Sequence, residues 1–258
     1  MDLDIKGLRV LVTAGANGIG LAIARAFIRE GAKVHTCDVD RSALSALASS
    51  DPAITQTLCD VADRTAVGKL FDDTIRTLGG LDVLVNNAGI AGPTARVEEM
   101  HPDDWDRCID ICLTGQFNCT RLAVPHLRKS SNGSIVNLSS AAGRLGFAMR
   151  SPYAAAKWGV IGFTKSLSIE LGPDNIRVNA ILPGLVAGDR QRRVLEAKAQ
   201  QRGISFAEME KTAFSFTSIK HYVTPEQIAD QILLLASPRG RTISGQAISI
   251  CGDTQMLG

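Results

Sequence analysis

Three side chains near the middle of the sequence could together move a proton on or off an alcohol oxygen. Tyr153 and Lys157 are four residues apart in the run Ser-Pro-Tyr-Ala-Ala-Ala-Lys, and Ser140 lies thirteen residues before the tyrosine. On a helix, the four-residue spacing places the phenol and the amine on one face. The ammonium group would stabilise a phenolate, which a free tyrosine does not form near neutral pH. With a serine hydroxyl to hydrogen-bond the reacting oxygen, this pattern predicts acid–base chemistry on an alcohol or a ketone.

The elements that must position these groups alternate along the chain. Strands are predicted at Arg9–Thr13, Lys33–Cys37, Thr55–Cys59, Val83–Asn86, Ile135–Leu138, Val178–Leu182 and Ala247–Ile250. Helices are predicted at Ile19–Arg29, Ser42–Ala48, Thr65–Leu78, Asp103–Leu127, Tyr153–Leu171 and Glu226–Ala236. Apolar strands separated by helices are typical of a parallel sheet covered on both faces. We therefore predict an α/β fold, a doubly wound parallel sheet (Rossmann fold), with a single domain over residues 1–258.

One segment, from Gly188 to Tyr222, breaks this alternation. It is basic and helical in pattern, and it is longer than an ordinary connection between elements. Its periodic apolar residues are Val194, Leu195, Phe206, Met209 and Phe214. We predict a helical substrate lid at about 188–222.

A glycine-rich turn follows the first strand and opens the first helix. Its predicted cofactor-binding residues are Gly15, Asn17, Gly18, Ile19 and Gly20. Glycines there let the backbone approach a pyrophosphate, and the free N–H groups of the helix N-terminus favour an anion. Asp38 ends the second strand, where its carboxylate could accept hydrogen bonds from ribose hydroxyls and would repel a 2′-phosphate. The pattern therefore indicates NAD rather than NADP; the simpler alternative is that Asp38 only caps the next helix.

With these motifs in order, the chain resembles the short-chain dehydrogenase/reductase family from about Leu8 to Gly252. The resemblance implies that Ser140, Tyr153 and Lys157 are the catalytic serine, tyrosine and lysine, the last two also facing the cofactor. It implies further cofactor contacts in the Asp-Val pair after the third strand, in the Asn-Asn-Ala-Gly motif and in the Pro-Gly loop after the sixth strand. These residues are Asp60, Val61, Asn87, Ala88, Gly89, Pro183, Gly184 and Val186.

Three positions depart from the family pattern. Ala14 replaces the usual first glycine of the cofactor turn, and Gly188 replaces a threonine that bonds the carboxamide of the nicotinamide. Cys112 stands where the family has the asparagine of its catalytic tetrad. That asparagine works largely through its backbone carbonyl, which a cysteine keeps. We therefore include Cys112 among the catalytic residues and expect activity to survive.

The loop between Ser140 and Tyr153 carries two arginines. In this family that loop walls the substrate pocket, and Arg150 resembles the carboxylate-holding lysine of the 3-hydroxybutyrate dehydrogenase branch, although Ala142 replaces that branch's histidine. Guanidinium groups suit the capture of a carboxylate. We predict that the loop's Arg144 and Arg150 bind substrate with the serine and the tyrosine, and that the substrate is a hydroxy acid or sugar acid. The alternative is that both arginines are solvated loop charges.

Several functions remain open on these residues. The leading one is an NAD-dependent dehydrogenase of a secondary alcohol with an acidic group. The first alternative is a 3-oxoacyl-thioester reductase, against which Asp38 argues because such enzymes favour NADP. A dehydrogenase of a neutral sugar, polyol or cyclic alcohol is a second, and a nucleotide-binding regulator without activity is a third.

Composition excludes other classes. A net charge of +2 over 258 residues gives no strong field for nucleic acid or a membrane surface. No apolar run approaches the roughly 18 residues of a spanning helix, and the first six residues, MDLDIK, do not resemble a signal peptide. The six cysteines have no Cys-x-x-Cys spacing and the histidines no ligand spacing. We predict a cytoplasmic enzyme without a metal, whose partners are its small-molecule substrate and itself, as a homotetramer formed through its long helices.

Overall fold

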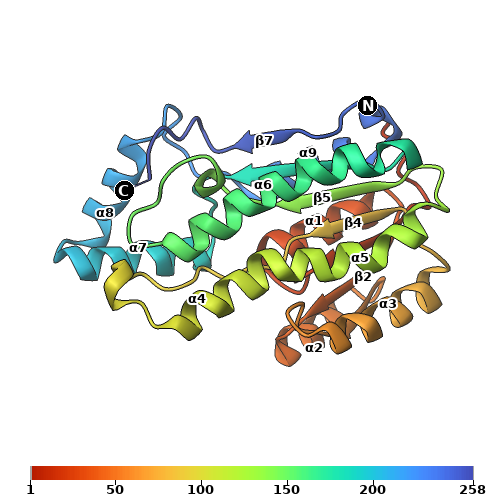
Figure 1. Cartoon of the computed structure of the whole chain (residues 1–258), viewed down its shortest axis with the longest axis horizontal. Coiled ribbons are helices and arrows are strands. Elements are labelled where there is room, and N and C mark those ends of the chain that lie inside the picture. The colour runs from red at the N-terminus through yellow and green to blue at the C-terminus, as the bar shows by residue number, and fades with distance from the viewer. Residues whose placement is uncertain (1, 258) are drawn as a thin grey trace.

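Seven parallel strands form one sheet in the order β3-β2-β1-β4-β5-β6-β7. The computed structural model describes residues 2–257. The strands are β1 Arg9–Thr13, β2 Lys33–Asp38, β3 Ile54–Leu58, β4 Val83–Asn86, β5 Ser134–Leu138, β6 Arg177–Pro183 and β7 Ala247–Ile250. The sheet and its helices confirm the predicted doubly wound Rossmann fold in a single domain (Figure 1).

The helices of residues 2–257 form layers on both faces of this sheet and a separate pair beside them. They are α1 Gly18–Arg29, α2 Arg41–Ser50, α3 Arg64–Leu78, α4 Pro102–Ile109, α5 Gly115–Leu127, α6 Ser151–Leu171, α7 Asp189–Arg202, α8 Phe206–Ser215 and α9 Pro225–Ala236. Buried side chains of α1, α2 and α9 form one hydrophobic layer with the sheet, and those of α3, α5 and α6 form the other. Within residues 2–257 no helix is long and apolar enough to cross a membrane.

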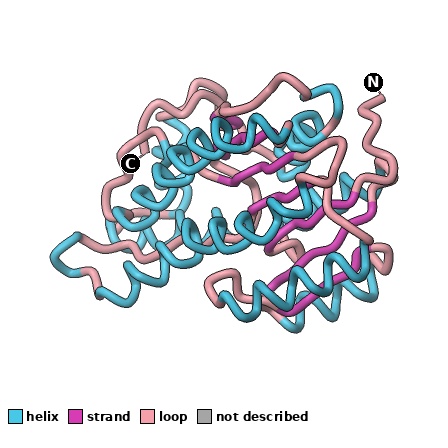
Figure 2. The backbone as a smooth tube through the Cα atoms, turned by 45° about the vertical axis from the view of Figure 1, so that its right-hand side comes forward, coloured by secondary structure: helices cyan, strands magenta, loops and turns pink. Residues whose placement is uncertain are grey.

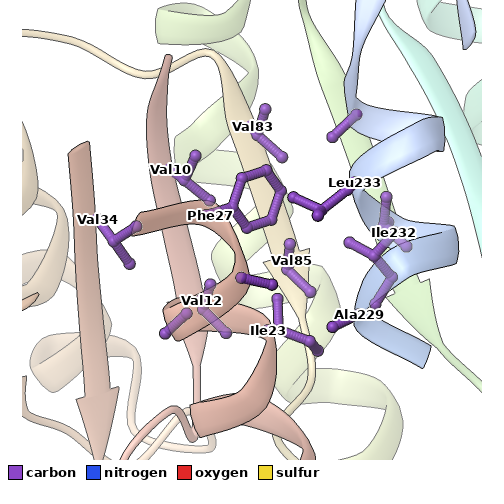
Figure 3. Close-up of a cluster of buried hydrophobic side chains, with 14 of the residues drawn as sticks. Val10, Val12, Ile23, Phe27, Val34, Val83, Val85, Ala229, Ile232 and Leu233 are labelled. Carbon is purple, nitrogen blue, oxygen red and sulfur yellow. The ribbon is translucent and has the colours of Figure 1, made fainter. Parts of the chain in front are cut away.

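The layer under α1 and α9 shows why the strands form where they do. Figure 3 shows Phe27 of α1 and Leu233 of α9 lying over Val83 and Val85 of β4. These four side chains are at most 5% exposed. Each fully buried side chain of this size contributes roughly 1.5–3 kcal/mol relative to exposure. β-Branched residues that are buried on both faces therefore define the central strands.

The strand order reverses between β1 and β4, and this reversal positions the site. From β1 the chain winds outward to β2 and β3, and from β4 it winds the other way to β5, β6 and β7. The loops that leave the two central strands therefore diverge. In open sheets of this kind a ligand crevice forms outside the carboxyl ends of the strands at that point. Figure 2 shows the strands side by side with helices on either side of them.

The long helix predicted over Asp103–Leu127 is interrupted. It consists of α4, a π-helical turn over Asp110–Thr114, and α5. Cys112 lies in that turn, and its sulfur accepts a hydrogen bond from the backbone N–H of Ile90, 3.4 Å away. Such π turns often occur at functional sites because they change which backbone groups are free.

Two helices lie apart from the main layers. α7 and α8, at the left of Figure 1, form a small core of their own from Leu195, Ala199 and Met209. At their base Val186 bridges Val223, and the N–H of Ala187 bonds the carbonyl of Val223 at 2.9 Å. We call residues 188–222, between these paired stretches, the α7–α8 segment.

Candidate active site

A cavity of about 720 Å³ lies at the carboxyl ends of β1, β2, β4, β5 and β6 and reaches under α7 and α8. Fourteen of the residues predicted from the sequence line it: Asn17, Gly18, Ile19, Gly20, Asp38, Asn87, Gly89, Ser140, Arg150, Tyr153, Lys157, Pro183, Gly184 and Val186. Six predicted residues do not: Gly15, Asp60, Val61, Ala88, Cys112 and Arg144. The structure therefore joins the glycine-rich turn, the serine and the tyrosine–lysine pair in one space.

The tyrosine and the lysine share one face of α6, as their spacing predicts. Lys157 Nζ lies 5.7 Å from the centre of the Tyr153 ring and donates a hydrogen bond to the carbonyl of Leu138 at 2.7 Å. The hydroxyl of Ser139 donates to the backbone carbonyl of Lys157 at 2.8 Å, which ties α6 to the end of β5. Ser140 lines the same cavity, and its Oγ accepts a bond from a nearby backbone N–H at 3.2 Å.

The glycine-rich turn fits a pyrophosphate. Asn17 is the N-cap of α1, and its side chain makes no hydrogen bond to the first N–H groups of the helix, which leaves them open to an anion. A Cβ on Gly20 would lie 2.1 Å from the carbonyl oxygen of Ala14, so only glycine allows this close turn. Ala14 itself has φ +52°, the left-handed conformation that glycine favours. The alanine therefore keeps the shape of the turn at some conformational cost.

The ends of β2 and β4 complete the nucleotide end of the cavity. Asp38 accepts hydrogen bonds from the N–H groups of Ala16 at 3.3 Å and Asp40 at 3.2 Å, and its carboxylate lines the cavity. The amide of Asn87 donates to the carbonyls of Thr13 and Ala14, at 2.9 and 3.0 Å. These bonds join the loop after β4 to the loop after β1.

The other predicted cofactor residues lie beside the cavity, where they form hydrogen bonds or close backbone contacts with neighbouring loops. Asp60 accepts a bond from Arg107 at 2.7 Å, and the carbonyl of Val61 accepts one from Asn118 at 3.0 Å. The N–H of Ala88 donates to the Thr13 hydroxyl at 2.9 Å. A Cβ on Gly15 would lie 2.0 Å from the hydroxyl of Thr36. These residues hold the loops that border the cavity.

Cys112 is fully buried behind the cavity wall. A Cβ added to Gly89 would lie 3.5 Å from Lys157 Nζ and 3.6 Å from Cys112 Sγ, so both atoms border one small space. The thiol of Cys108 and the Lys157 ammonium hold the pKa of Cys112 well below its usual range. The sulfur also lies 3.5 Å from the carbonyl oxygen of Ile90, to which a thiol can donate.

Arg150 enters the cavity from the residue before α6. It is only 2% exposed, and its Cζ lies 5.1 Å from the centre of the Phe147 ring and 5.3 Å from that of Tyr153. One Nη donates to the carbonyl of Ala91, but Nε and the other Nη are buried without a hydrogen-bond partner among residues 2–257. Burial lowers the pKa of this guanidinium. The preceding Met149 has φ +64°, a strained conformation that turns the chain inward.

Arg144 lies outside the cavity that contains Tyr153 and Arg150. Its guanidinium donates to the carbonyl of Ala247 and to the hydroxyl of Ser249, so it binds the edge strand β7. It lines a second, more open hollow, beside Tyr222 and Asp253. Arg144 does not line the cavity that contains Tyr153, so the predicted role of Arg144 at the substrate has no support from its position.

Other residues of the cavity were not singled out by the sequence. They include Phe147, Lys198 and, from the C-terminal tail, Thr254, Met256 and Leu257. Arg190 and Arg193 also line the cavity, and the sequence marks them either as anion-binding residues or as part of a solvated charged helix face. Arg190 donates to the carbonyl of Gly89 at 3.1 Å. Within the basic α7, only the alternation of buried and exposed positions distinguishes Lys198 from its charged neighbours. The C-terminal tail reaches the cavity through an isolated β-bridge between Phe147 and Leu257, and no local sequence pattern predicts this pairing.

Comparison with known proteins agrees with this geometry. A family model described as enoyl-(acyl carrier protein) reductase matches residues 13–252. The chain is 36% identical to the 3-oxoacyl-[acyl-carrier-protein] reductase FabG of Thermotoga maritima, over 97% of this chain and 98% of that protein. It is 41% identical to the 2-dehydro-3-deoxy-L-rhamnonate dehydrogenase (NAD(+)) of a Sphingomonas species, over 69% of this chain and 71% of that protein. The crystal structure of an NAD⁺-bound xylitol dehydrogenase superposes with a TM-score of 0.91 at 29% identity, covering 96% of this chain and 99% of that one.

The fold and the cavity define an oxidoreductase with a Rossmann-type nucleotide site. Its tyrosine, lysine and serine meet where a dinucleotide would end, beyond the turn that opens α1. The chain belongs to the short-chain dehydrogenase/reductase family, and it acts on CH–OH groups or the corresponding ketones.

Proposed function

We propose that this enzyme is an NAD-dependent dehydrogenase of a secondary alcohol that carries an acidic group. One observation carries the substrate part of the proposal. Arg150 is a buried cation in the same cavity as Tyr153, and two of its nitrogens lack partners among residues 2–257. Buried donors of a charged group that lack acceptors are costly, and a carboxylate that accepted from them would reduce that cost.

The cofactor part rests on Asp38. Its carboxylate lines the nucleotide end of the cavity, where it would accept bonds from ribose hydroxyls and would repel a 2′-phosphate. The relative from Sphingomonas and the xylitol dehydrogenase are both named with NAD, which supports the same choice.

The chain's own groups would move the proton. When bound, the nicotinamide supplies the acceptor or donor of the hydride. Tyr153, as phenolate, takes the proton of the substrate hydroxyl in oxidation and returns it to the ketone oxygen in reduction. The Lys157 ammonium, on the same face of α6, stabilises the phenolate. Ser140 holds the reacting oxygen by a hydrogen bond, and the α7–α8 segment serves as a lid that excludes water.

A second candidate is reduction of a 3-oxoacyl thioester. The FabG relative matches nearly the whole chain, which favours it. Arg150 argues against it, because the part of a thioester substrate beside the reacting carbon is uncharged. Preference for NADP and for a thioester would identify this alternative.

The test compares each acid with its own neutral derivative. NAD⁺ and NADP⁺ reduction is measured with 3-hydroxybutyrate, lactate and galactonate, each beside its methyl ester or amide. We expect NAD⁺ and an acid to be preferred, the acid by at least tenfold in kcat/KM. Arg150→Met should remove the preference, and Tyr153→Phe should abolish turnover while NADH still binds. Equal kcat/KM for acid and ester refutes the acidic substrate, and full activity of Tyr153→Phe refutes the catalytic assignment.

We further propose a homotetramer in a reducing cytoplasm. The six cysteines are free, and five of them are buried. The assembly is argued with its test at the end of the Discussion.

A further inference from the structure

We propose that Gln116 of α5 is a positioning residue for Lys157. The side-chain amide of Gln116 shares the backbone carbonyl of Leu138 with the lysine, and this sharing leaves more of the ammonium charge to act on Tyr153. The inference rests on the proposed roles of Tyr153 and Lys157, but it does not depend on which alcohol the enzyme oxidises. It adds a residue outside the cavity to those that affect proton transfer.

Two donors converge on one oxygen at the end of β5. Lys157 Nζ donates to the carbonyl of Leu138 at 2.7 Å, and Gln116 Nε2 donates to the same oxygen at 3.2 Å. The lysine comes from α6 and the glutamine from α5, and the two residues are 3% and 2% exposed. Leu138 itself lines the cavity, whereas Gln116 does not. The glutamine therefore reaches the lysine through the backbone of β5.

The bond to Leu138 is what the amide group of Gln116 contributes. Among residues 2–257, the Oε1 atom of this side chain is buried without a hydrogen-bond partner. A buried polar atom without a partner lowers stability, and a methionine of similar length would avoid that loss. The Nε2–H group at Leu138 is therefore the part of the side chain that an apolar residue cannot replace.

The shared carbonyl affects how strongly the lysine is held. A carbonyl oxygen can accept two hydrogen bonds, and each donor partly neutralises the negative charge that attracts the other. The bond from Gln116 therefore weakens the attraction of Leu138 for the ammonium group. Lys157 Nζ lies 5.7 Å from the centre of the Tyr153 ring, close enough in a buried site for its charge to favour a phenolate. Loss of the Gln116 donor would draw the charge toward Leu138 and disfavour the phenolate.

Other ionisable groups lie beside Tyr153 and Lys157 or line the same cavity. They are Cys108 of α4, Cys112 of the π-helical turn, Arg150 before α6, and Asp189, Arg190, Arg193 and Lys198 of α7. Within residues 2–257 the side chain of Gln116 forms its hydrogen bond to Leu138 and to none of these groups. A change at Gln116 therefore acts on the tyrosine–lysine pair through the carbonyl and leaves the other charges in place.

A tyrosinate titration tests the proposal without any substrate. The chain has two tyrosines, and burial together with the Glu210 carboxylate raises the pKa of Tyr222. The lower step of the titration, followed by near-ultraviolet absorbance, therefore belongs to Tyr153, and Tyr153→Phe should remove it. Gln116→Met keeps the side-chain length but loses the donor, so we expect the midpoint of this step to rise by about half a pH unit or more. The midpoint of the pH profile of kcat/KM for alcohol oxidation should rise with it.

Two control variants separate positioning from packing. Gln56→Met is the matched change on β3, because Gln56 Nε2 also donates to a backbone carbonyl, that of Leu44, at 2.8 Å, and its Oε1 also lacks a partner among residues 2–257. Thr120→Val removes a buried hydroxyl one helical turn after Gln116, where Thr120 accepts a bond from Asn86 at 3.1 Å. Both variants should keep the wild-type midpoint. Thermal melting and NADH fluorescence show that each variant is folded, and Gln116→Leu replaces Gln116→Met if the latter does not fold.

The outcomes separate this proposal from the proposed function. If Gln116→Met keeps the wild-type midpoint, the glutamine only packs and this proposal is wrong. An equal rise in Thr120→Val would also overturn it, because the shift would then follow from any polar loss on α5. A lack of preference for acids refutes the acidic substrate but leaves this test intact, since the titration uses no substrate. If Tyr153→Phe retains full activity, the catalytic assignment is wrong, and the inferred effect of Gln116 on catalysis is lost with it.

Discussion

The sulfur of Cys112 and the ammonium of Lys157 border one small space beside Gly89, and we propose that this lysine stabilises the Tyr153 phenolate. The lowered pKa of Cys112 favours its thiolate, whose charge would oppose the stabilisation that the ammonium gives to a Tyr153 phenolate. Cys112→Ala removes this charge but keeps the backbone carbonyl of the π-helical turn. We expect the pH at which kcat/KM for alcohol oxidation reaches half its maximum to fall in this variant, with the plateau preserved within about threefold, which is well under 1 kcal/mol.

The control is Cys119→Ala, since burial raises the pKa of that thiol and leaves it uncharged. Its pH profile should coincide with that of the wild type. An unchanged midpoint in Cys112→Ala would show that the sulfur carries no charge that matters to the reaction.

We expect the choice of cofactor to depend on Asp38, whose carboxylate lines the nucleotide end of the cavity. Asp38→Ser removes the acceptor for ribose hydroxyls and the charge that repels a 2′-phosphate. The ratio of kcat/KM for NAD⁺ to that for NADP⁺ should therefore fall by at least tenfold, the equivalent of roughly 1.4 kcal/mol. Asp63→Ser is the control, because Asp63 is an aspartate that accepts backbone N–H bonds, as Asp38 does, but lies outside the cavity. An unaltered ratio in Asp38→Ser would leave the cofactor choice without this explanation.

At the scale of secondary-structure elements, the pairing of β2 with β3 contains a buried histidine. His35 is 2% exposed, and its ring nitrogens contact the hydroxyls of Thr55 and Thr57 at 2.8 and 3.0 Å. Burial lowers the pKa of His35 to about 4. Between pH 6.5 and pH 4 this histidine is protonated in the unfolded chain but stays neutral in the folded chain. The free energy of unfolding is therefore unaffected by His35 above pH 6.5 and decreases as the pH falls toward 4. The loss amounts to about 3 kcal/mol.

Denaturant titrations at several pH values test this expectation. His35→Asn keeps a polar side chain between the two threonines but does not titrate, so its free energy of unfolding should fall less between pH 6.5 and 4. His101→Asn, which changes an exposed histidine, should follow the wild type. Identical pH dependence of wild type and His35→Asn would assign the acid sensitivity to other groups.

The elements also show what the sequence could and could not predict. Strands such as Arg9–Thr13 and Ala247–Ile250 match the predicted bounds, because short apolar runs in the sequence mark both of them. The break at Asp110–Thr114 was missed, since the periodic pattern continues through it and only the contact of Cys112 with the loop after β4 marks it. For the same reason the inward turn of Lys198 was not predicted: it depends on the packing of α7 against distant parts of the chain.

The residues of the candidate site were also predictable only where their relation is local in the sequence. Tyr153 and Lys157 were predictable because their relation is local, one helical turn apart. Arg144 and Arg150 could not be told apart, although they lie six residues from each other. Arg144 follows the short turn after Ser140 and contacts β7, whereas Arg150 follows Met149, whose left-handed backbone directs the chain into the cavity. Neither backbone conformation is clearly indicated by the local sequence.

At the scale of the whole molecule, large apolar side chains remain exposed on the layer that α5 and α6 form. Trp158 is 52% and Ile169 80% exposed, and their separation of eleven residues places both on one face of α6. Phe117 of α5 is 43% exposed in the same layer (Figure 1). Burying side chains of this size is worth roughly 1.5–3 kcal/mol each. A second copy of the chain, related by a twofold axis, would cover this face with the same face of its own.

We therefore expect sedimentation velocity to find the wild type at four times the mass of one chain, and Trp158→Glu/Ile169→Glu at twice that mass or less. The double variant should keep the wild-type circular dichroism spectrum, because neither side chain belongs to the core. Val97→Glu, a change at an exposed valine remote from α6 in sequence, should sediment as the wild type does. A monomeric wild type would exclude the tetramer. An unchanged assembly in the double variant would move the interface away from α6, because two carboxylates cannot be buried there without large cost.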